Sequence, residues 1–324
     1  MKVLVSGGAG YIGSHFVKLL YASGHQPIVV DNLVRGHRES VLHGIALEDI
    51  DILDYPALAS VFQTYMPDAV VHFAAFAYVG ESVEKPEIYY KNNVVGSLKL
   101  INACTEFGVK NFVFSSTCSV YGNPQRIPIP ETESVKPINP YANTKYMIET
   151  ILKDFETAYG MKYAALRYFN AAGADPGGEL GESHDPETHL IPLILQTAQK
   201  KRDKILVFGN DYNTLDGTCV RDYIHVMDLA DAHLKALEYL ANGNKSEIIN
   251  LGTGKGNSVL EIIEKAKTIT GKNILFEIIE RRTGDPAILV ADNKKAKEVL
   301  GWVPKYGIDE ILNSAWQWQE NQKY

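Results

Sequence analysis

The sequence has few cysteines and no long apolar run. Its three cysteines, Cys104, Cys118 and Cys219, are an odd number at spacings that match no metal motif, so we expect reduced thiols. No apolar stretch reaches the length of a membrane span. The first residues enter a strand-like segment without the features of a secretory signal peptide. These absences predict a cytoplasmic protein that does not contact a membrane.

The chain also lacks an excess of positive charge. Its 32 Lys and Arg residues are outnumbered by 39 Asp and Glu residues, which gives a formal net charge of −7. Nucleic acids and anionic membrane surfaces attract basic proteins, so neither is an expected partner. None of the nine histidines forms a pair with metal-ligand spacing, and we expect no metal.

The first half of the chain alternates strand-like and helix-like segments. The expected strands are 2–6, 28–31, 69–73, 111–115 and 163–167, and the expected helices are 14–23, 54–65, 89–107 and 141–159. Such alternation predicts parallel strands with helices on both faces of the sheet. The fold class is therefore α/β, with a Rossmann-type doubly wound parallel sheet.

The pattern changes after residue 170. Residues 171–188 are rich in Gly, Pro and acidic residues, and a loop of this length is usually functional. Beyond it, helices at 191–199, 226–240 and 259–270 mix with strands at 205–208, 248–250 and 275–279. We expect an NAD-binding domain at 1–170, to which 221–250 returns. We expect a smaller mixed α/β substrate lobe at 171–220 and 251–324.

A glycine-rich turn separates the first strand from the first helix. Glycines allow a tight turn and a close approach of the backbone to a pyrophosphate, which the helix N-terminus then binds through its free N–H groups. Such turns are common, but a strand before and a helix after favour a dinucleotide site. The residues assigned to the cofactor here are Gly7, Gly10, Tyr11, Ile12 and Gly13.

An acidic residue ends the second strand. Asp31 can accept hydrogen bonds from the adenosine ribose and would repel a 2′-phosphate, which favours NAD over NADP. Arg35 argues weakly for NADP, but we interpret it as a solvated loop arginine. Asn32 is assigned to the same site, and Asp51 and Ile52 could flank the adenine.

Tyr141 and Lys145 are four residues apart on a predicted helix, so both lie on one face. Tyrosine titrates near ~10, but a nearby ammonium and a positive nicotinamide ring would favour its phenolate. This pair predicts redox chemistry at a hydroxyl group. A hydroxyl from residues 115–119, at the carboxyl end of a strand, could share the substrate proton, and spacing alone does not choose among the candidates.

At these residues the sequence resembles the extended short-chain dehydrogenase/reductase family. Further segments resemble the UDP-glucose 4-epimerases within it, over essentially the whole chain. These segments are 71–75, 79–82, 92–94, 167–170, 209–212, 216–218, 220–226 and 281–285. The resemblance implies a UDP-hexose substrate and a permanently bound NAD. Tyr141 would take the proton of the sugar 4-hydroxyl while hydride passes from carbon 4 to NAD, and the hydride would return to the opposite face of the 4-keto sugar.

The resemblance also assigns the remaining site residues. Thr117 would bind the reacting oxygen, so the catalytic set is Tyr141, Lys145 and Thr117. The further cofactor residues it implies are Phe73, Ala74, Ala75, Asn92, Ser115 and Phe169. The implied substrate residues are Asn170, His189, Leu190, Leu206, Phe208, Arg221, Arg282, Asp285 and Leu289.

The implied reaction constrains substrate binding. A hexose that must rotate cannot be held tightly, so binding energy has to come from the nucleotide. Arg221 and Arg282 would supply cations for the diphosphate, and Asp285 would bind the uridine ribose. Leu289 stands where some epimerases have a bulky tyrosine, which predicts room for N-acetylated UDP-hexosamines. His189 stands where many members of the family have asparagine, so the resemblance does not fix its contact with the uridine nucleotide.

The same fold supports other functions. A nucleotide-sugar 4,6-dehydratase would need an Asp-Glu pair after Thr117, where this chain has Cys118-Ser119. A decarboxylase or a simple dehydrogenase is harder to exclude from residue types. A non-catalytic NAD-binding regulatory protein would not need the reactive pair. The resemblance further implies a homodimer formed through helices 89–107 and 141–159.

Overall fold

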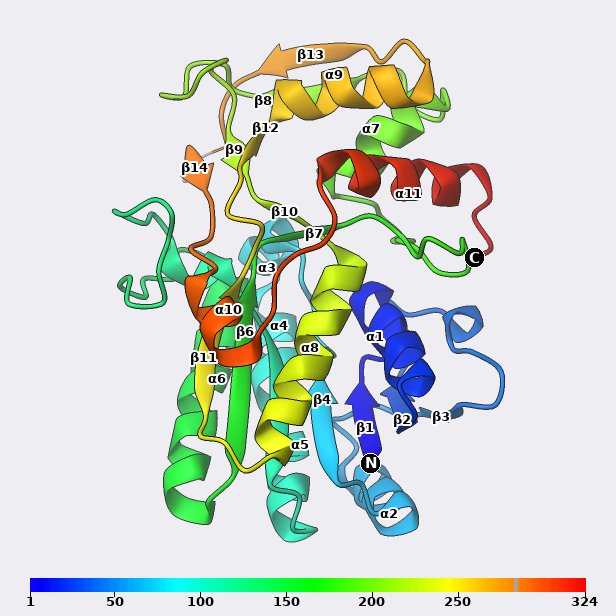
Figure 1. Ribbon diagram of the computed structural model, residues 1–324, viewed down its shortest axis with the longest axis vertical. Coiled ribbons are helices and arrows are strands. Elements are labelled where there is room, and N and C mark those ends of the chain that lie inside the picture. Colours follow the sequence, from blue (N-terminus) through cyan, green and yellow to red (C-terminus); the bar gives the residue numbers. More distant parts are fainter. Residues whose placement is uncertain (283–284) are drawn as a thin grey trace.

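Seven parallel strands form the central sheet of the computed structural model, which describes residues 1–282 and 285–324 (Figure 1). The order across the sheet is β3-β2-β1-β4-β5-β6-β11, and every neighbouring pair is parallel. The strands are β1 (Lys2–Ser6), β2 (Gln26–Asp31), β3 (Ala46–Asp49), β4 (Ala69–His72), β5 (Asn111–Thr117), β6 (Lys162–Tyr168) and β11 (Glu247–Leu251). This topology confirms the predicted fold class.

Helices cover both faces of this sheet because successive side chains of a strand point to opposite sides. Val3 and Val5 belong to a core that includes α1 and α8, whereas Leu4 belongs to a core that includes α2, α5 and α6. The helices are α1 (Tyr11–Ala22), α8 (Val226–Ala241), α2 (Tyr55–Tyr65), α5 (Gly96–Glu106) and α6 (Pro140–Tyr159). Strands buried on both faces explain the continuous apolar runs in the sequence.

The helix expected at 89–107 is interrupted. The structure has α3 (Val79–Glu84), α4 (Pro86–Tyr89), the π-helical segment η2 (Tyr90–Val95) and then α5. Within η2, the buried Asn93 accepts a hydrogen bond from the Phe76 backbone N–H at 2.9 Å and donates to the Thr144 hydroxyl at 3.1 Å. Its amide therefore joins the loop after β4 to α6. Periodicity alone could not show this wider turn, a type that often marks functional sites.

A smaller lobe lies at the top of Figure 1. Its core packs Ile194, Ile263 and Leu312 from three helices. The lobe contains α7 (Leu190–Ala198), α9 (Val259–Thr270), α11 (Ile308–Glu320), β8 (Ile205–Phe208) and β13 (Phe276–Ile279). Two small sheets pair β7 (Asn170–Ala172) with β10 (Tyr223–His225), and β9 (Val220–Arg221) with β12 (Asn257–Ser258) and β14 (Ile288–Leu289). Two short 3₁₀ segments are η1 (Arg38–Ser40) and η3 (Cys118–Tyr121).

The segment that contains residues 294–302 does not follow the expected division into lobes. The rest of that division stays a prediction. We assigned 251–324 to the substrate lobe, but Ala296 and Leu300 of α10 (Lys294–Leu300) pack in the core beside β1 and α8. Trp302 joins the same core and donates its Nε1–H to the Asp228 carbonyl at 3.0 Å. Neither α10 nor α11 was predicted. The chain thus returns to the large sheet after building part of the second lobe.

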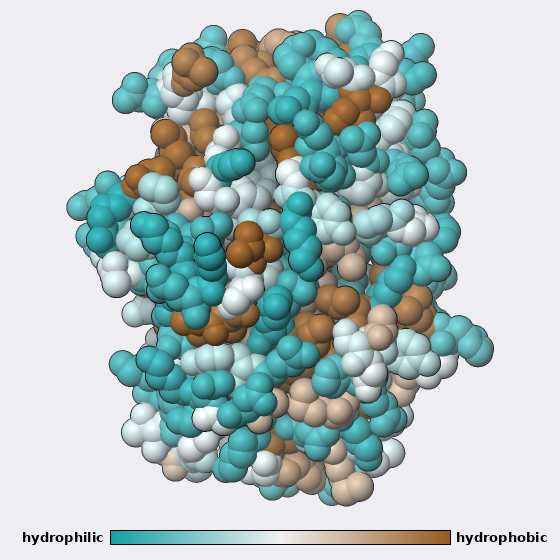
Figure 2. Space-filling view, in the orientation of Figure 1, coloured by the Kyte–Doolittle hydropathy of each residue, from teal (hydrophilic) through white to brown (hydrophobic). Residues whose placement is uncertain are grey.

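The surface in Figure 2 is mainly hydrophilic, with apolar side chains in small separate groups. Within the described part of the chain, no helix combines the length and apolar character needed to cross a membrane.

Candidate active site

The turn between β1 and α1 is built so that only glycine fits at two positions. Gly7 has φ +75°, and a Cβ there would lie 2.4 Å from the Ala74 nitrogen. A Cβ on Gly13 would lie 2.1 Å from the Gly7 carbonyl oxygen. Gly10 is the N-cap of α1 and has no side chain to cap the first turn, so the N–H groups of that turn are available to an anion.

A cleft opens at the carboxyl ends of β1, β2 and β4. The predicted cofactor residues that line it are Gly7, Gly10, Asp31, Asn32, Ile52, Phe73, Ala74, Ala75 and Asn92. Residues of the lining that we did not predict are Val30, Val34, Arg35, Gly36, Ile50 and Phe76. Predicted residues outside the lining are Tyr11, Ile12, Gly13, Asp51, Ser115, Tyr141, Lys145 and Phe169. The unpredicted residues flank predicted ones, so a wider window around each motif would have found them.

Asp31 is held where a ribose would meet it. Its two carboxylate oxygens accept hydrogen bonds from the backbone N–H groups of Ala9, at 3.0 Å, and Leu33, at 2.9 Å. Burial raises the pKa of this carboxyl group. Each oxygen keeps a lone pair for a ribose hydroxyl. Asn32 donates to Asp51 at 3.1 Å, which brings another predicted cofactor residue to this end of the cleft.

Arg35 lines the cleft. We expected a solvated loop arginine, but its side chain makes several contacts. Its guanidinium pairs with Glu81 at 3.2 Å and lies over the Tyr78 ring at 4.6 Å from the centroid. It also donates to the Asp185 carbonyl at 3.2 Å. These contacts neutralise the cation that a 2′-phosphate would need, so the cleft fits NAD better than NADP.

The reactive pair comes from the first turns of α6. Asn139 caps this helix by accepting from the Ala142 N–H at 2.8 Å, and Pro140 suits the first helical position. Tyr141 and Lys145 are both buried, and the Lys145 ammonium donates to the Ser115 carbonyl at 2.8 Å. The helix start that the sequence encodes therefore aims both side chains at the carboxyl end of β5.

The structure shows which of the hydroxyl groups at the end of β5 lies beside Tyr141, a choice that the sequence spacing left open. Ser115 donates to the Tyr168 hydroxyl at 3.1 Å, and Ser116 donates to Glu149 at 2.6 Å. Thr117 is buried at the end of β5, and its side chain lies close enough to Tyr141 to lower the pKa of the tyrosine. Among Ser115, Ser116 and Thr117, the threonine is thus the one placed beside the tyrosine.

A buried network that we did not predict supports this strand end. Glu149 forms an ion pair with Arg167 at 2.5 Å, and Arg167 donates to the Tyr121 hydroxyl at 3.0 Å. Tyr121 donates to Asn250 at 2.7 Å. The network ties α6 to β6, η3 and β11. Its sequence signal is an acidic residue four positions after Lys145 on the same helix face.

The direction of the tyrosine's pKa differs from our expectation. We expected the ammonium to favour the phenolate, but burial raises the pKa of Tyr141 well above its usual value, and the nearby Thr117 side chain only partly opposes this rise. Burial also lowers the pKa of Lys145 to about 7, although Glu149 raises it. In the protein alone both groups are therefore pushed toward their neutral forms.

Five of the predicted substrate residues lie on the small sheets and β8, namely Asn170, Leu206, Phe208, Arg221 and Leu289. Arg221, on β9, pairs with Asp285 at 2.5 Å, so these two contact each other. Leu289, on β14, is in register with Arg221 and packs in the cluster that contains Phe169 and Cys118. Arg282 is exposed and lies over the Phe208 ring at 3.8 Å from the centroid. Thr283 and Gly284 of the resembling segment 281–285 lie outside the described residues.

The other substrate candidates surround these residues or lie on adjoining elements. Asn170 starts β7, and its backbone N–H donates to the Asp222 carbonyl at 3.0 Å. Leu206 is half-exposed on β8. His189 is the N-cap residue of α7, which Leu190 begins, and its Nδ1 lies 2.5 Å from Glu182 Oε1. His189 thus joins a cluster of acidic residues and histidines whose local sequence pattern we overlooked.

The chain matches the model of the NAD dependent epimerase/dehydratase family over residues 3–252. It belongs to this family. The matched residues contain the glycine turn, Thr117, Tyr141, Lys145 and Arg221, whereas Arg282, Asp285 and Leu289 follow the matched region.

Members of the epimerase/dehydratase family resemble the chain over nearly its full length. The UDP-glucose 4-epimerase of Streptococcus mutans is 52% identical over 324 residues, 99% of this chain and 97% of that protein. The crystal structure of UDP-glucose 4-epimerase from Brucella ovis in complex with NAD is 50% identical, with a TM-score of 0.95 over 97% of each chain. The UDP-Glc/GlcNAc 4-epimerase of Campylobacter jejuni is 41% identical, with a TM-score of 0.87 over 99% of each chain.

Proposed function

We propose that this protein interconverts UDP-glucose and UDP-galactose by epimerising carbon 4, with NAD bound in the cleft beside Asp31. The single observation that carries this proposal is the buried Tyr141–Thr117 pair with Lys145, at the carboxyl end of β5. The relatives of nearly equal length, named UDP-glucose 4-epimerases, support the same substrate.

Bound NAD would supply the oxidant and then the reductant for carbon 4. Tyr141 would accept the proton of the 4-hydroxyl and later return it, while Thr117 holds the reacting oxygen. Because burial raises the pKa of Tyr141, the phenolate needs positive charge nearby. Lys145 would supply that charge in its protonated form and would also hold the nicotinamide ribose.

Arg221 and Arg282 would bind the diphosphate. Asp285 would bind the uridine ribose, and for this its ion pair with Arg221 would have to open. Asn170, His189, Leu190, Leu206 and Phe208 would complete the nucleotide pocket. Holding the nucleotide rather than the hexose leaves the sugar free to turn over.

Leu289 would set the room beside the sugar, since it packs with Phe169 next to the catalytic strand end. We therefore propose a second activity on UDP-N-acetylglucosamine, as the name of the Campylobacter jejuni relative records for that enzyme. An assay of UDP-N-acetylglucosamine beside UDP-glucose tests this, and absence of turnover with the former would contradict it.

A dehydratase is disfavoured by the residues after Thr117. Elimination of water needs an acid–base pair at this position. Burial raises the pKa of Cys118 to about 12, and Ser119 is no acid, so neither can replace the missing carboxylates.

We further propose a cytoplasmic homodimer formed through α5 and α6. In support, Val95 just before α5 and Tyr146 and Met147 on α6 are more than one-third exposed. Light scattering after size-exclusion chromatography would give twice the chain mass; a monomer at all concentrations would contradict it.

The deciding experiment is conversion of UDP-galactose to UDP-glucose by the purified protein without added NAD. We expect turnover that Tyr141→Phe lowers by about 10²- to 10⁴-fold, the usual range for a lost acid–base group. Tyr159→Phe, on the same helix but half-exposed, is the matched control and should keep activity. Bound NAD with no sugar turnover would instead support a regulatory NAD-binding protein.

A further inference from the structure

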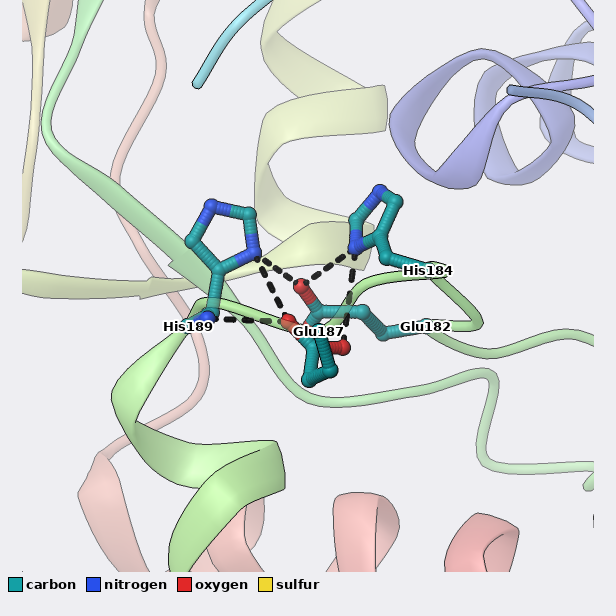
Figure 3. Close-up of side chains that lie close together, drawn as sticks. All are labelled: Glu182, His184, Glu187 and His189. Carbon is teal, nitrogen blue, oxygen red and sulfur yellow. Dashed lines mark hydrogen bonds and ion pairs between the residues drawn. The ribbon is translucent and has the colours of Figure 1, made fainter. Parts of the chain in front are cut away.

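Four side chains from one eight-residue segment meet beside the glycine turn (Figure 3). His184 Nδ1 lies 3.2 Å from Glu182 Oε1 and 3.6 Å from Glu187 Oε2. His189 Nδ1 lies 2.5 Å from Glu182 Oε1 and 3.5 Å from Glu187 Oε1. One ligand atom from each residue falls within 4.8 Å of the other three. No other such group of three or more occurs in 1–282 or 285–324.

These separations suit a small cation. Zn²⁺ binds imidazole nitrogen and carboxylate oxygen at about 2.0–2.2 Å in a tetrahedron, which places its ligands about 3.4 Å apart. Two nitrogens and two carboxylates favour Zn²⁺ and its transition-metal neighbours over Mg²⁺ and Ca²⁺, which prefer oxygen alone. The distances of 3.2, 3.6 and 3.5 Å are close to this value, and the 2.5 Å distance between His189 and Glu182 is shorter.

The burial of the cluster gives a second indication. The carboxylates of Glu182 and Glu187 are only 6% exposed. His184 Nδ1 is buried and makes no hydrogen bond of acceptable geometry with any described residue, although it faces both carboxylates. A buried imidazole nitrogen that faces two carboxylates can give its lone pair to a cation once the cation displaces its proton. His189, 46% exposed, leaves one side open for entry.

We propose that Glu182, His184, Glu187 and His189 form a binding site for one divalent transition-metal ion of the Zn²⁺ class. The sequence signal is Glu-x-His-x-x-Glu-x-His, which we did not predict to bind a metal. The site shares His189 with the proposed nucleotide pocket, but metal binding does not depend on the proposed epimerase activity.

The place of the site in the fold gives the ion a structural role. The Glu182 carbonyl accepts from Trp318 Nε1 at 2.9 Å, and the Ser183 carbonyl lies 3.0 Å from His37 Nε2. The His184 ring lies edge-on to the Tyr11 ring of the glycine turn, 6.2 Å between centroids. A bound ion would therefore fasten this segment over the cofactor turn and beside the start of α7.

The same residues can also form ion pairs without a metal. Burial alone would lower the pKa of His184, but the carboxylates of Glu182 and Glu187 raise it to about 10. A cation would have to displace protons from the imidazoles. The experiment must therefore distinguish a metal site from a set of buried ion pairs.

Tag-free protein, purified with its bound cofactor and treated with EDTA, is titrated with Zn²⁺ by calorimetry and its melting temperature is measured. We expect one equivalent bound per chain and a rise in melting temperature of several degrees. His184→Gln and Glu182→Gln should each weaken binding by more than about tenfold. His43→Gln, an exposed histidine outside the cluster, should bind as the unaltered protein does.

Co²⁺ provides a measurement that does not depend on whether the variants fold. The unaltered protein should show the intense visible absorption of tetrahedral Co²⁺, and Zn²⁺ should abolish it. No Zn²⁺ binding and no Co²⁺ spectrum would overturn the proposal in favour of a permanent ion-pair cluster. Equal binding by His184→Gln and the unaltered protein would overturn it too.

Discussion

The two halves of the site are built in different ways. The cofactor half follows from the backbone of one sheet, because its glycines and Asp31 stand at the carboxyl ends of β1 and β2. The nucleotide half comes from two-residue strands and side chains that contact each other, as Arg221 and Asp285 do. NAD binding in the first half should therefore be lost when a substitution creates a steric conflict with the backbone. Nucleotide binding in the second half should be lost when a substitution removes a charge.

The largest effect that would test this difference is expected at Arg221. Arg221→Met removes a largely buried charge and leaves Asp285 facing the expected diphosphate. The lower kcat/KM should correspond to a loss of about 2–5 kcal/mol of transition-state stabilisation, expressed mostly as a higher KM. Steady-state kinetics on UDP-galactose measure it. Arg38→Met, which removes an exposed ion pair with Asp49, is the control and should change little. An unchanged KM would remove Arg221 from the substrate site.

A smaller effect, of a different kind, is expected at Gly13. Gly13→Ala places a methyl group 2.1 Å from the Gly7 oxygen, an overlap that should cost about 1–3 kcal/mol and reduce the NAD retained through purification. Gly80→Ala meets no atom within 4 Å and is the matched control. Full NAD content in the Gly13 variant would show that the turn is less rigid than its geometry indicates.

Lys145 lies between the halves and gives a pH signature. Burial lowers its pKa from 10.5 to about 7, so from about pH 7 upward the unfolded chain holds a proton that the folded chain has lost. Stability should therefore rise with pH across this window, by at most ~1.4 kcal/mol per unit. In Lys145→Met this rise should disappear, whereas the exposed Lys153→Met should keep it. Urea unfolding at several pH values measures the slope, and equal slopes in all three proteins would contradict the burial argument.

The smallest effect is expected at Leu289. Leu289→Tyr should fill the room beside the sugar and lower activity on UDP-N-acetylglucosamine relative to UDP-glucose by about tenfold, the range for a modest change in pocket shape. Leu275→Tyr, at an exposed leucine, should leave the ratio unchanged. An unaltered ratio in the Leu289 variant would place the size limit elsewhere.

The sequence predicted most of the large sheet because its signals are local. Apolar runs mark β1, β4 and β5, and Asn139 with Pro140 marks the start of α6. The π-helical η2 could not be predicted, since Asn93 is held by Phe76, which is distant in the chain. The resemblance, rather than local pattern, supplied the residues of the nucleotide half.

Three features of the site depended on contacts that no short window contains. Arg221 meets Asp285 across 64 positions, and Arg167 meets Glu149 between a strand and a helix. The pKa of Tyr141 depends on burial that only the assembled lobes create. The cluster of Glu182, His184, Glu187 and His189 differs from these three features, because its four residues lie within eight positions and a short sequence window contains them all.

The most direct test of the central account uses UDP-galactose that carries deuterium on carbon 4. The protein, given no added NAD, should produce UDP-glucose with the label retained on carbon 4, because the sugar is oxidised and reduced within one closed site. Loss of the label to solvent, or a need for added NAD in each turnover, would contradict the account.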